Sequence, residues 1–163
     1  MKPSSAKLVV EGLKEAGVTL VACLPDSWMW EVYHQVSQDK HFKTVPVCNE
    51  GEGVAICAGA WAGGKKAVML MENSGLRVAS EALGRLGGLP VMMFMGYRGD
   101  IGDGNWWAVP IGSTTEPMLN ALKIPYAMVT DEGEIKKSIV RAFRTLDASR
   151  SHVAVLFSGD LIW

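Results

Sequence analysis

Glu50 has the residue type and the sequence position of a carboxylate that could activate a bound cofactor. It follows a short apolar segment, residues 43–47, and begins a run rich in small residues that extends to Ala62. This pattern predicts a strand that passes into a helix, the position at which open α/β sheets bind ligands. An acidic residue also favours a helix N-terminus through the helix dipole, so the residue alone leaves both interpretations open.

Three other segments place polar residues directly after apolar runs. They are Pro25-Asp26-Ser27, Glu72-Asn73-Ser74-Gly75 and Tyr97-Arg98-Gly99-Asp100. Each has a simpler explanation, because Asp, Ser and Asn cap helices or form turns and a lone arginine is often a solvated loop residue. Together with Glu50, these segments define the edge of the predicted sheet at which we expect a ligand to bind.

Six apolar segments and six helical segments alternate along the chain and would position these residues. The expected strands are 19–24, 43–47, 67–71, 90–95, 126–129 and 153–157. The expected helices begin at Ser4 or Ser5, at Asp26 or Ser27, and then cover 50–62, 78–86, 115–122 and 132–146. Because the strands are continuously apolar, we predict an α/β fold with a doubly wound, mostly parallel six-stranded sheet and helices on both faces.

Composition excludes several classes of protein. The length of 163 residues suits one domain. With 16 basic and 17 acidic residues, the chain lacks the excess positive charge typical of nucleic-acid-binding proteins. No apolar run reaches the roughly 18 residues of a membrane span, and the N-terminus lacks a signal peptide, so we expect a cytoplasmic protein with no membrane partner. The three cysteines lack the spacing of metal ligands, and we expect them to be buried thiols.

Nucleotide-binding fingerprints are also missing from the expected positions. No Gly-x-Gly-x-x-Gly follows the first strand, and no Gly-x-x-x-x-Gly-Lys-Ser/Thr occurs. Gly102-Asp103-Gly104-Asn105 is interpreted as a turn, because it does not follow an apolar strand. The surrounding stretch, residues 96–113, is long enough to be functional or mobile. Nine methionines and six tryptophans could fill the core or cover a subunit contact.

Several ordered motifs resemble one enzyme family. Asn49-Glu50-Gly51, Ala58-Gly59, Gly64-Lys65, Met71 to Leu76 and Gly96 to Asp100 follow one another as in the pyrimidine-binding domain of thiamine-diphosphate enzymes. The chain is most similar to the branch of phosphonopyruvate decarboxylase and the sulfopyruvate decarboxylase α subunit, which Pro25-Asp26-Ser27 and the segment 121–126 also fit. The resemblance spans nearly the whole chain.

The resemblance implies a role for each candidate. Glu50 would hydrogen-bond N1′ of the aminopyrimidine and favour its 4′-imino form, which takes the proton from the thiazolium C2. Asn73, Ser74 and Gly75 would lie against the pyrimidine ring. Asp26, Ser27 and Arg98 would face the substrate, a small 2-oxo acid, and the guanidinium could bind an acidic group. The family histidine after the arginine aligns with Ala108, so the proton donor and the substrate tail could differ.

The resemblance also implies a partner. In this family a second domain binds the diphosphate and Mg²⁺, and we expect residues 1–163 to be a single pyrimidine-binding domain without metal ligands of its own. The expected assembly is a hetero-oligomer with a diphosphate-binding β subunit, acting as a lyase that decarboxylates 2-oxo acids. Two alternatives stay open: a carboligase subunit with the same cofactor, and a non-catalytic binding or regulatory module on the same fold.

Overall fold

The computed structural model describes residues 1–162 and contains one six-stranded parallel sheet. The strand order is β2-β1-β3-β4-β6-β5. The strands are β1 (Leu20–Cys23), β2 (Lys43–Pro46), β3 (Ala67–Glu72), β4 (Met92–Gly96), β5 (Tyr126–Val129) and β6 (Val153–Phe157). The predicted doubly wound α/β fold is therefore confirmed, and every strand pair is parallel.

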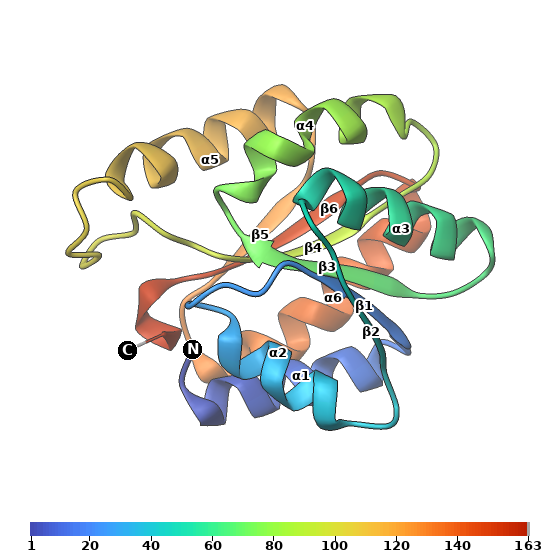
Figure 1. Cartoon of the computed structure of the whole chain (residues 1–163), viewed down its shortest axis with the longest axis horizontal. Helices are drawn as coiled ribbons and strands as arrows, with labels where there is room; N and C mark the ends of the chain where they lie inside the picture. Colours follow the sequence, from blue (N-terminus) through green and yellow to red (C-terminus); the bar gives the residue numbers. More distant parts are fainter. Residues whose placement is uncertain (163) are drawn as a thin grey trace.

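Six α-helices cover the sheet in two layers. They are α1 (Pro3–Glu15), α2 (Trp30–Gln38), α3 (Glu50–Ala62), α4 (Gly75–Arg85), α5 (Val109–Ala121) and α6 (Ile135–Ser149). Figure 1 shows α3, α4 and α5 on one face of the sheet and α1, α2 and α6 on the other. The 3₁₀ turns η1 (Glu132–Glu134) and η2 (Gly159–Leu161) complete the structure.

The strands form the core because their side chains are buried on both faces. All five residues of β4 and of β6 are buried, as expected for a parallel sheet covered by helices. The methionines of β3 and β4 are completely inaccessible, so these residues fill the core rather than an interface: Met69, Met71, Met92, Met93 and Met95. The tryptophans are divided, since Trp28 is buried whereas Trp30, Trp106 and Trp107 are exposed.

Three helices begin earlier than the sequence predicts, and one of them is α4, which begins at Gly75 rather than near Val78. Helix α1 begins at Pro3, and both Ser4 and Ser5 donate hydrogen bonds to Glu132 Oε1, at 2.7 and 2.6 Å, instead of capping the helix. Helix α5 begins at Val109 rather than near Thr115. Pro110 lies in its first turn, where a fixed φ suits the helix and the missing N–H costs nothing.

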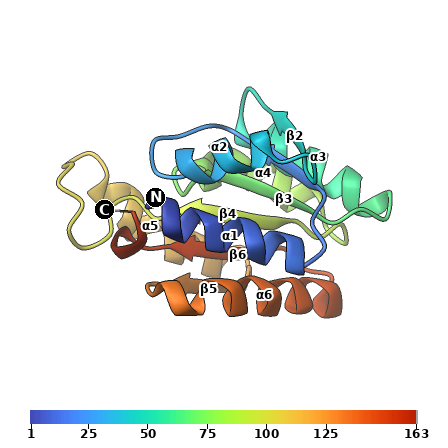
Figure 2. The same ribbon diagram turned by 90° about the horizontal axis from the view of Figure 1, so that it is seen from below.

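The topology creates a switch point between β1 and β3. Strand β1 leads to β2 on one side, whereas β3 follows on the other side of β1. The segments after β1 and β3 therefore diverge at the carboxyl end of the sheet, called here the carboxyl edge, and such a crevice is where doubly wound sheets bind ligands. Figures 1 and 2 show the segment between β4 and α5 projecting past this edge. No helix within residues 1–162 is long and apolar enough to cross a membrane.

Candidate active site

A reciprocal cap fixes the start of α3 and therefore the position of Glu50. The Asn49 side chain accepts a hydrogen bond from the Glu52 N–H at 2.9 Å, and Glu52 Oε2 accepts one from the Cys48 N–H at 2.8 Å. Such a capping box satisfies two N–H groups that the helix cannot pair itself. Since Glu52 closes the cap, Glu50 is not required for it and its carboxylate is available for another role.

The Glu50 side chain has no protein partner. Only 8% of the residue is accessible, and among residues 1–162 no hydrogen bond or ion pair reaches its carboxylate. The carboxylate oxygens keep some contact with solvent, since Asp26 Oδ2 is the one fully buried side-chain oxygen or nitrogen without a partner in these residues. Glu50 therefore presents a largely enclosed but unpaired carboxylate at the carboxyl edge.

Gly75 packs directly against this carboxylate. A Cβ at position 75 would lie 2.7 Å from both Cδ and Oε1 of Glu50, too close for any side chain. The structure thus brings Glu50 together with the predicted loop 73–75, although these residues lie on different helices. The absence of a side chain at Gly75 is a steric requirement of the site.

Asn73 joins three elements of the carboxyl edge. Its fully buried amide donates to the Arg98 carbonyl at 3.0 Å and to Thr115 Oγ1 at 2.9 Å, and its Oδ1 accepts from the Arg98 N–H at 2.9 Å. Ser74 donates to Glu72 Oε1 at 2.8 Å. Asn73 therefore holds the loop in place through its side chain, and the loop meets Glu50 through Gly75.

Arg98 is enclosed by protein groups. Its Nε donates to Asp103 Oδ2 at 2.8 Å and its Nη2 to Asp103 Oδ1 at 3.3 Å, and the two side chains are 6% and 0% exposed. The guanidinium carbon lies 4.9 Å from the ring centroid of Trp28 and 4.4 Å from that of Trp107. Asp103 occupies the Nε and Nη2 groups of the guanidinium, which could otherwise bind a carboxylate. Binding of a substrate anion by Arg98 therefore stays a prediction.

Asp103 organises the loop between β4 and α5. Besides Arg98, its carboxylate accepts hydrogen bonds from the N–H of Gly99 and from both the N–H and the side chain of Asn105. Burial alone would raise the pKa of Asp103, but these hydrogen bonds outweigh it and hold the pKa well below its usual range. Asp103 is therefore ionised and matches the charge of Arg98.

Asp26 combines a capping oxygen with an unpaired one. Oδ1 accepts from the N–H groups of Trp28 and Met29, at 2.7 and 2.9 Å, whereas Oδ2 is the one buried side-chain atom in residues 1–162 without a partner. Burial raises the pKa of Asp26 to about 6, and the nearby charge of Glu72 adds to the effect against the two backbone hydrogen bonds. Ser27, the neighbouring candidate, is exposed.

The predicted residues form one connected region. Glu50 meets Gly75, Asn73 bonds to Arg98, and Arg98 stacks on Trp28 beside Asp26. Sequence reasoning missed three members of it: Asp103, Trp28 and Thr115. The one available signal for Asp103 was its position, five residues after Arg98 in a glycine-rich loop. The segment was interpreted as a turn, and Asp103 does accept a hydrogen bond from the Asn105 N–H within it.

The position aligned with the family histidine lies inside the protein. Ala108 is fully buried, and its carbonyl accepts hydrogen bonds from the N–H groups of Ile111 and Gly112. Gly99, with φ +77°, packs against this turn so closely that a Cβ would lie 2.7 Å from the Gly112 nitrogen. The close contact between Gly99 and Gly112 holds together the two ends of the segment between β4 and α5.

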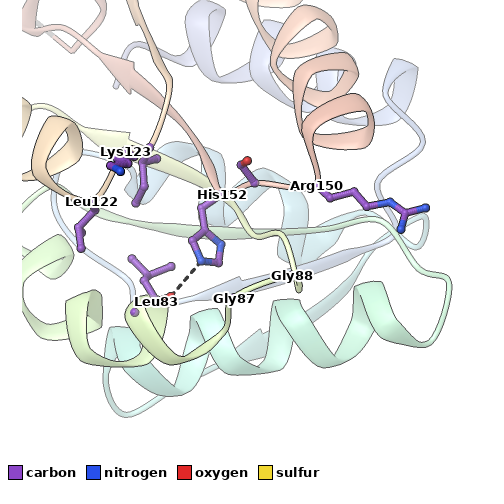
Figure 3. A pocket seen from close by; sticks show the side chains of 10 residues that line it. Leu83, Gly87, Gly88, Leu122, Lys123, Arg150 and His152 are labelled. Carbon is purple, nitrogen blue, oxygen red and sulfur yellow. Dashed lines mark hydrogen bonds between the residues drawn. The ribbon is translucent and has the colours of Figure 1, made fainter.

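A pocket of about 310 Å³ lies at the end of the sheet opposite the candidate site (Figure 3). It is formed where α4, α5 and α6 end, and His152 Nε2 lies 3.0 Å from the Leu83 carbonyl oxygen. Burial lowers the pKa of His152, so the imidazole is neutral at physiological pH. None of the predicted site residues lines this pocket. Nor does any described part of the chain bring together three side chains suited to hold a metal ion.

The chain folds as an open α/β domain with Glu50 and the other candidate residues at its carboxyl edge. No family model matches the chain. The chain is 34% identical over 142 residues to the sulfopyruvate decarboxylase subunit alpha of Methanothermobacter thermautotrophicus, covering 85% of this chain and 86% of that protein. It is 29% identical over 163 residues to the same subunit of Methanococcus maripaludis, covering 98% and 97%.

A longer relative matches over the same region. The phosphonopyruvate decarboxylase of Streptomyces viridochromogenes is 28% identical over 148 residues, which are 88% of this chain and 36% of that protein. The chain thus spans about a third of this relative and nearly the whole of the two subunits. It belongs to the family of sulfopyruvate decarboxylase α subunits, so the predicted resemblance is confirmed and the chain is a decarboxylase subunit by descent.

Proposed function

We propose that this chain is the pyrimidine-binding subunit of a two-chain, thiamine-diphosphate-dependent 2-oxo acid decarboxylase. The observation that carries the proposal is the Glu50 carboxylate, largely enclosed at the carboxyl edge with no protein partner. The two subunits named sulfopyruvate decarboxylase, and the longer phosphonopyruvate decarboxylase, support decarboxylation as the reaction.

The site fits an aminopyrimidine ring. An unpartnered carboxylate can accept a hydrogen bond from a protonated ring nitrogen, and burial strengthens such a charge-assisted bond. Gly75 leaves the space beside Glu50 free of a side chain, which allows a flat ring to approach the backbone of the loop. When bound, thiamine diphosphate would supply the electron sink for loss of carbon dioxide.

The residues of this chain would then bind, orient and transfer protons. Glu50 holds a proton at N1′ of the ring, and the loop 73–75 orients the ring against it. Asp26 and Ser27 lie at the neighbouring strand end, on the side proposed for the substrate. Mg²⁺ and the diphosphate are assigned to the partner subunit, since no group of metal-ligating side chains occurs within residues 1–162.

A separate partner subunit is supported by the relatives and by the surface. The name "subunit alpha" implies a second subunit in those enzymes, and the phosphonopyruvate decarboxylase carries most of its length outside the matched region. The exposed large apolar residues of the described chain include Ile101 and Trp106, which are 99% and 83% accessible and lie beside the site. Exposed apolar side chains of this size are typical of interaction surfaces.

The test is to co-express the chain with the diphosphate-domain subunit of the same organism. Release of carbon dioxide from several 2-oxo acids would be measured with and without thiamine diphosphate and Mg²⁺. We expect activity only with both subunits and the cofactor, and a loss of at least about a hundredfold for Glu50→Gln.

Glu52→Gln is the matched control, because it makes the same chemical change two residues away and glutamine can still close the capping box. It should retain activity within a few-fold of the wild type. Equal activity of Glu50→Gln and the wild type would refute the assignment of Glu50. Binding of thiamine diphosphate, followed by fluorescence, gives a second readout that does not depend on turnover.

A further inference from the structure

We propose that the protein binds a small phosphorylated molecule in a basic pocket at the amino end of the sheet, remote from the candidate active site. The pocket has a volume of about 330 Å³ and lies beside the first residues of β1 and β2 and the turn that precedes β3. Glu50 and the other candidate residues lie at the opposite, carboxyl edge. The inference is therefore independent of the proposed function.

The parallel register of the sheet brings basic residues from separate segments together. Leu20, at the start of β1, is paired with Lys43 on one side and with Ala67 on the other. Neighbouring strands lie about 4.8 Å apart, so Lys43 and the turn that precedes Ala67 flank the start of β1 at close range. That turn contributes Lys65 to the pocket, and the turn before β2 contributes Lys40. Three lysines thus line one concave surface.

These three lysines have no partners among residues 1–162, where no hydrogen bond or ion pair reaches their side chains. The nearby carboxylates are already engaged, since Asp39 pairs with Lys14 and Asp147 pairs with Lys66 at 2.9 Å. No acidic side chain of the described chain lines the pocket. A cleft lined by charges of one sign concentrates the electrostatic potential, so this one attracts anions.

Hydrogen bonds hold the backbone beneath the lysines in place. The Lys43 N–H donates to the Thr19 carbonyl at 2.8 Å, and His41 Nε2 lies 2.9 Å from the Val18 carbonyl oxygen. The His41 ring packs edge-on against Phe42, with 4.7 Å between the ring centroids. Both rings line the pocket, so the lysines extend from a fixed surface that is partly apolar.

This combination favours a small molecule with two or more negative charges. Lysine binds phosphate groups as a point charge, and three unpaired ammonium groups can neutralise a diphosphate. The ring surface of Phe42 beside them offers a contact for the carbon skeleton of such a ligand. The acidic carboxyl edge of a second copy is the alternative occupant, but the volume and concave shape of the pocket match those of small-molecule sites.

The experiment titrates the purified protein, alone or with any subunit that is isolated with it, with inorganic pyrophosphate at low ionic strength. Binding should be saturable with a Kd below about 1 mM. Shifts of the amide resonances should be confined to residues 18–20, 39–43 and 63–67. Lys43→Gln and Lys65→Gln should each raise the Kd by about fivefold, because each removes one charge at contact distance.

Lys7→Gln is the matched control, because it makes the same change at another exposed, unpaired lysine, near the opposite end of α1. It should leave the Kd within twofold of the wild type, and thermal unfolding would establish that all three variants are folded. Equal effects of Lys7→Gln and Lys43→Gln, or equal shifts with sulfate at matched ionic strength, would overturn the proposal. Citrate binding as tightly as pyrophosphate would overturn the assignment to phosphorylated ligands. Self-association that Lys43→Gln abolishes, without pyrophosphate binding, would assign the pocket to a second copy instead.

Discussion

Arg98 and Asp103 form a buried ion pair that closes the loop between β4 and α5 on itself. The Nε–Oδ2 distance is 2.8 Å, the carboxylate is fully inaccessible, and two indole rings enclose the guanidinium. Every hydrogen bond of this carboxylate comes from residues 98–105, so the pair specifies the course of the loop. Arg98, which the sequence suggests as a substrate-binding residue, thus orders the loop through its pair with Asp103.

Removal of one partner of this pair should be costly. We expect Arg98→Met to lower the free energy of unfolding by about 3–5 kcal/mol, because a buried Asp103 carboxylate is then left without its counter-ion. Urea unfolding would measure the loss. The double variant with Asp103→Asn should recover part of it, and Arg85→Ala, which breaks an exposed pair, should change stability by less than about 1 kcal/mol. Equal effects of Arg98→Met and Arg85→Ala would contradict the buried pair.

Acid should weaken the same loop. The pKa of Asp103 is lower in the folded protein than in the unfolded chain, so its contribution to stability is complete above about pH 4 and is lost as the pH falls further. Unfolding free energies measured between pH 5 and pH 2 should therefore decline less steeply for Asp103→Asn than for the wild type. Parallel curves for the two proteins would exclude this carboxylate as a source of the decline.

Asp26 should give the free energy of unfolding a pH dependence opposite to that from Asp103. Its pKa is raised to about 6, so the protonated form stabilises the folded protein and this contribution is lost as the pH rises from about 4 through 6. Asp26→Asn, which cannot ionise, should lack this dependence and gain about 2 kcal/mol relative to the wild type at pH 8. The measurement is the pH dependence of urea unfolding, and a wild-type curve that rises through this window to the same extent as that of the variant would refute it.

Gly75→Ala should abolish activity of the assembled enzyme with little effect on assembly. The added methyl group would displace the Glu50 carboxylate, against which the glycine packs. Gly84→Ala lies on the same helix with no atom within 4 Å of the new Cβ, so it should keep full activity and raise stability by about 0.5–1 kcal/mol. The two variants would be compared by carbon dioxide release, and normal turnover of Gly75→Ala would refute the steric argument.

Asn73→Ala should destabilise the carboxyl edge as a whole. The substitution removes two donated hydrogen bonds and one accepted hydrogen bond. It leaves the Arg98 carbonyl without this donor, while the Arg98 N–H keeps its bond to the Gly96 carbonyl, at a total cost of about 3 kcal/mol. Hydrogen exchange of the amides of residues 97–105 should become faster. Asn120→Ala, at an exposed position near the end of α5, is the control, and similar exchange in both variants would count against Asn73 as the link between the loops.

The fold and the position of Glu50 could be predicted because both depend on local patterns. Apolar segments alternate with helical ones, and continuously apolar strands indicate a parallel sheet covered by helices on both faces. The partners of Arg98 could not be predicted, since its pairing with Asp103 depends on the path of a glycine-rich loop and its stacking on Trp28 joins distant segments. Nor could composition distinguish buried methionines from interfacial ones, because Met serves both purposes. The start of α5 was missed because residues 96–113 are rich in glycine and show little periodicity, so the first turn of the helix was interpreted as part of the loop.

The contact between Gly75 and Glu50 also has a consequence for evolution. A lineage that keeps the glutamate at position 50 in this position has no room for a side chain at position 75, whereas a lineage that has lost the glutamate is free of this constraint. Residue 75 therefore reports on residue 50. Among related chains, a glycine replaced at this position would mark descendants that have kept the fold and abandoned the chemistry.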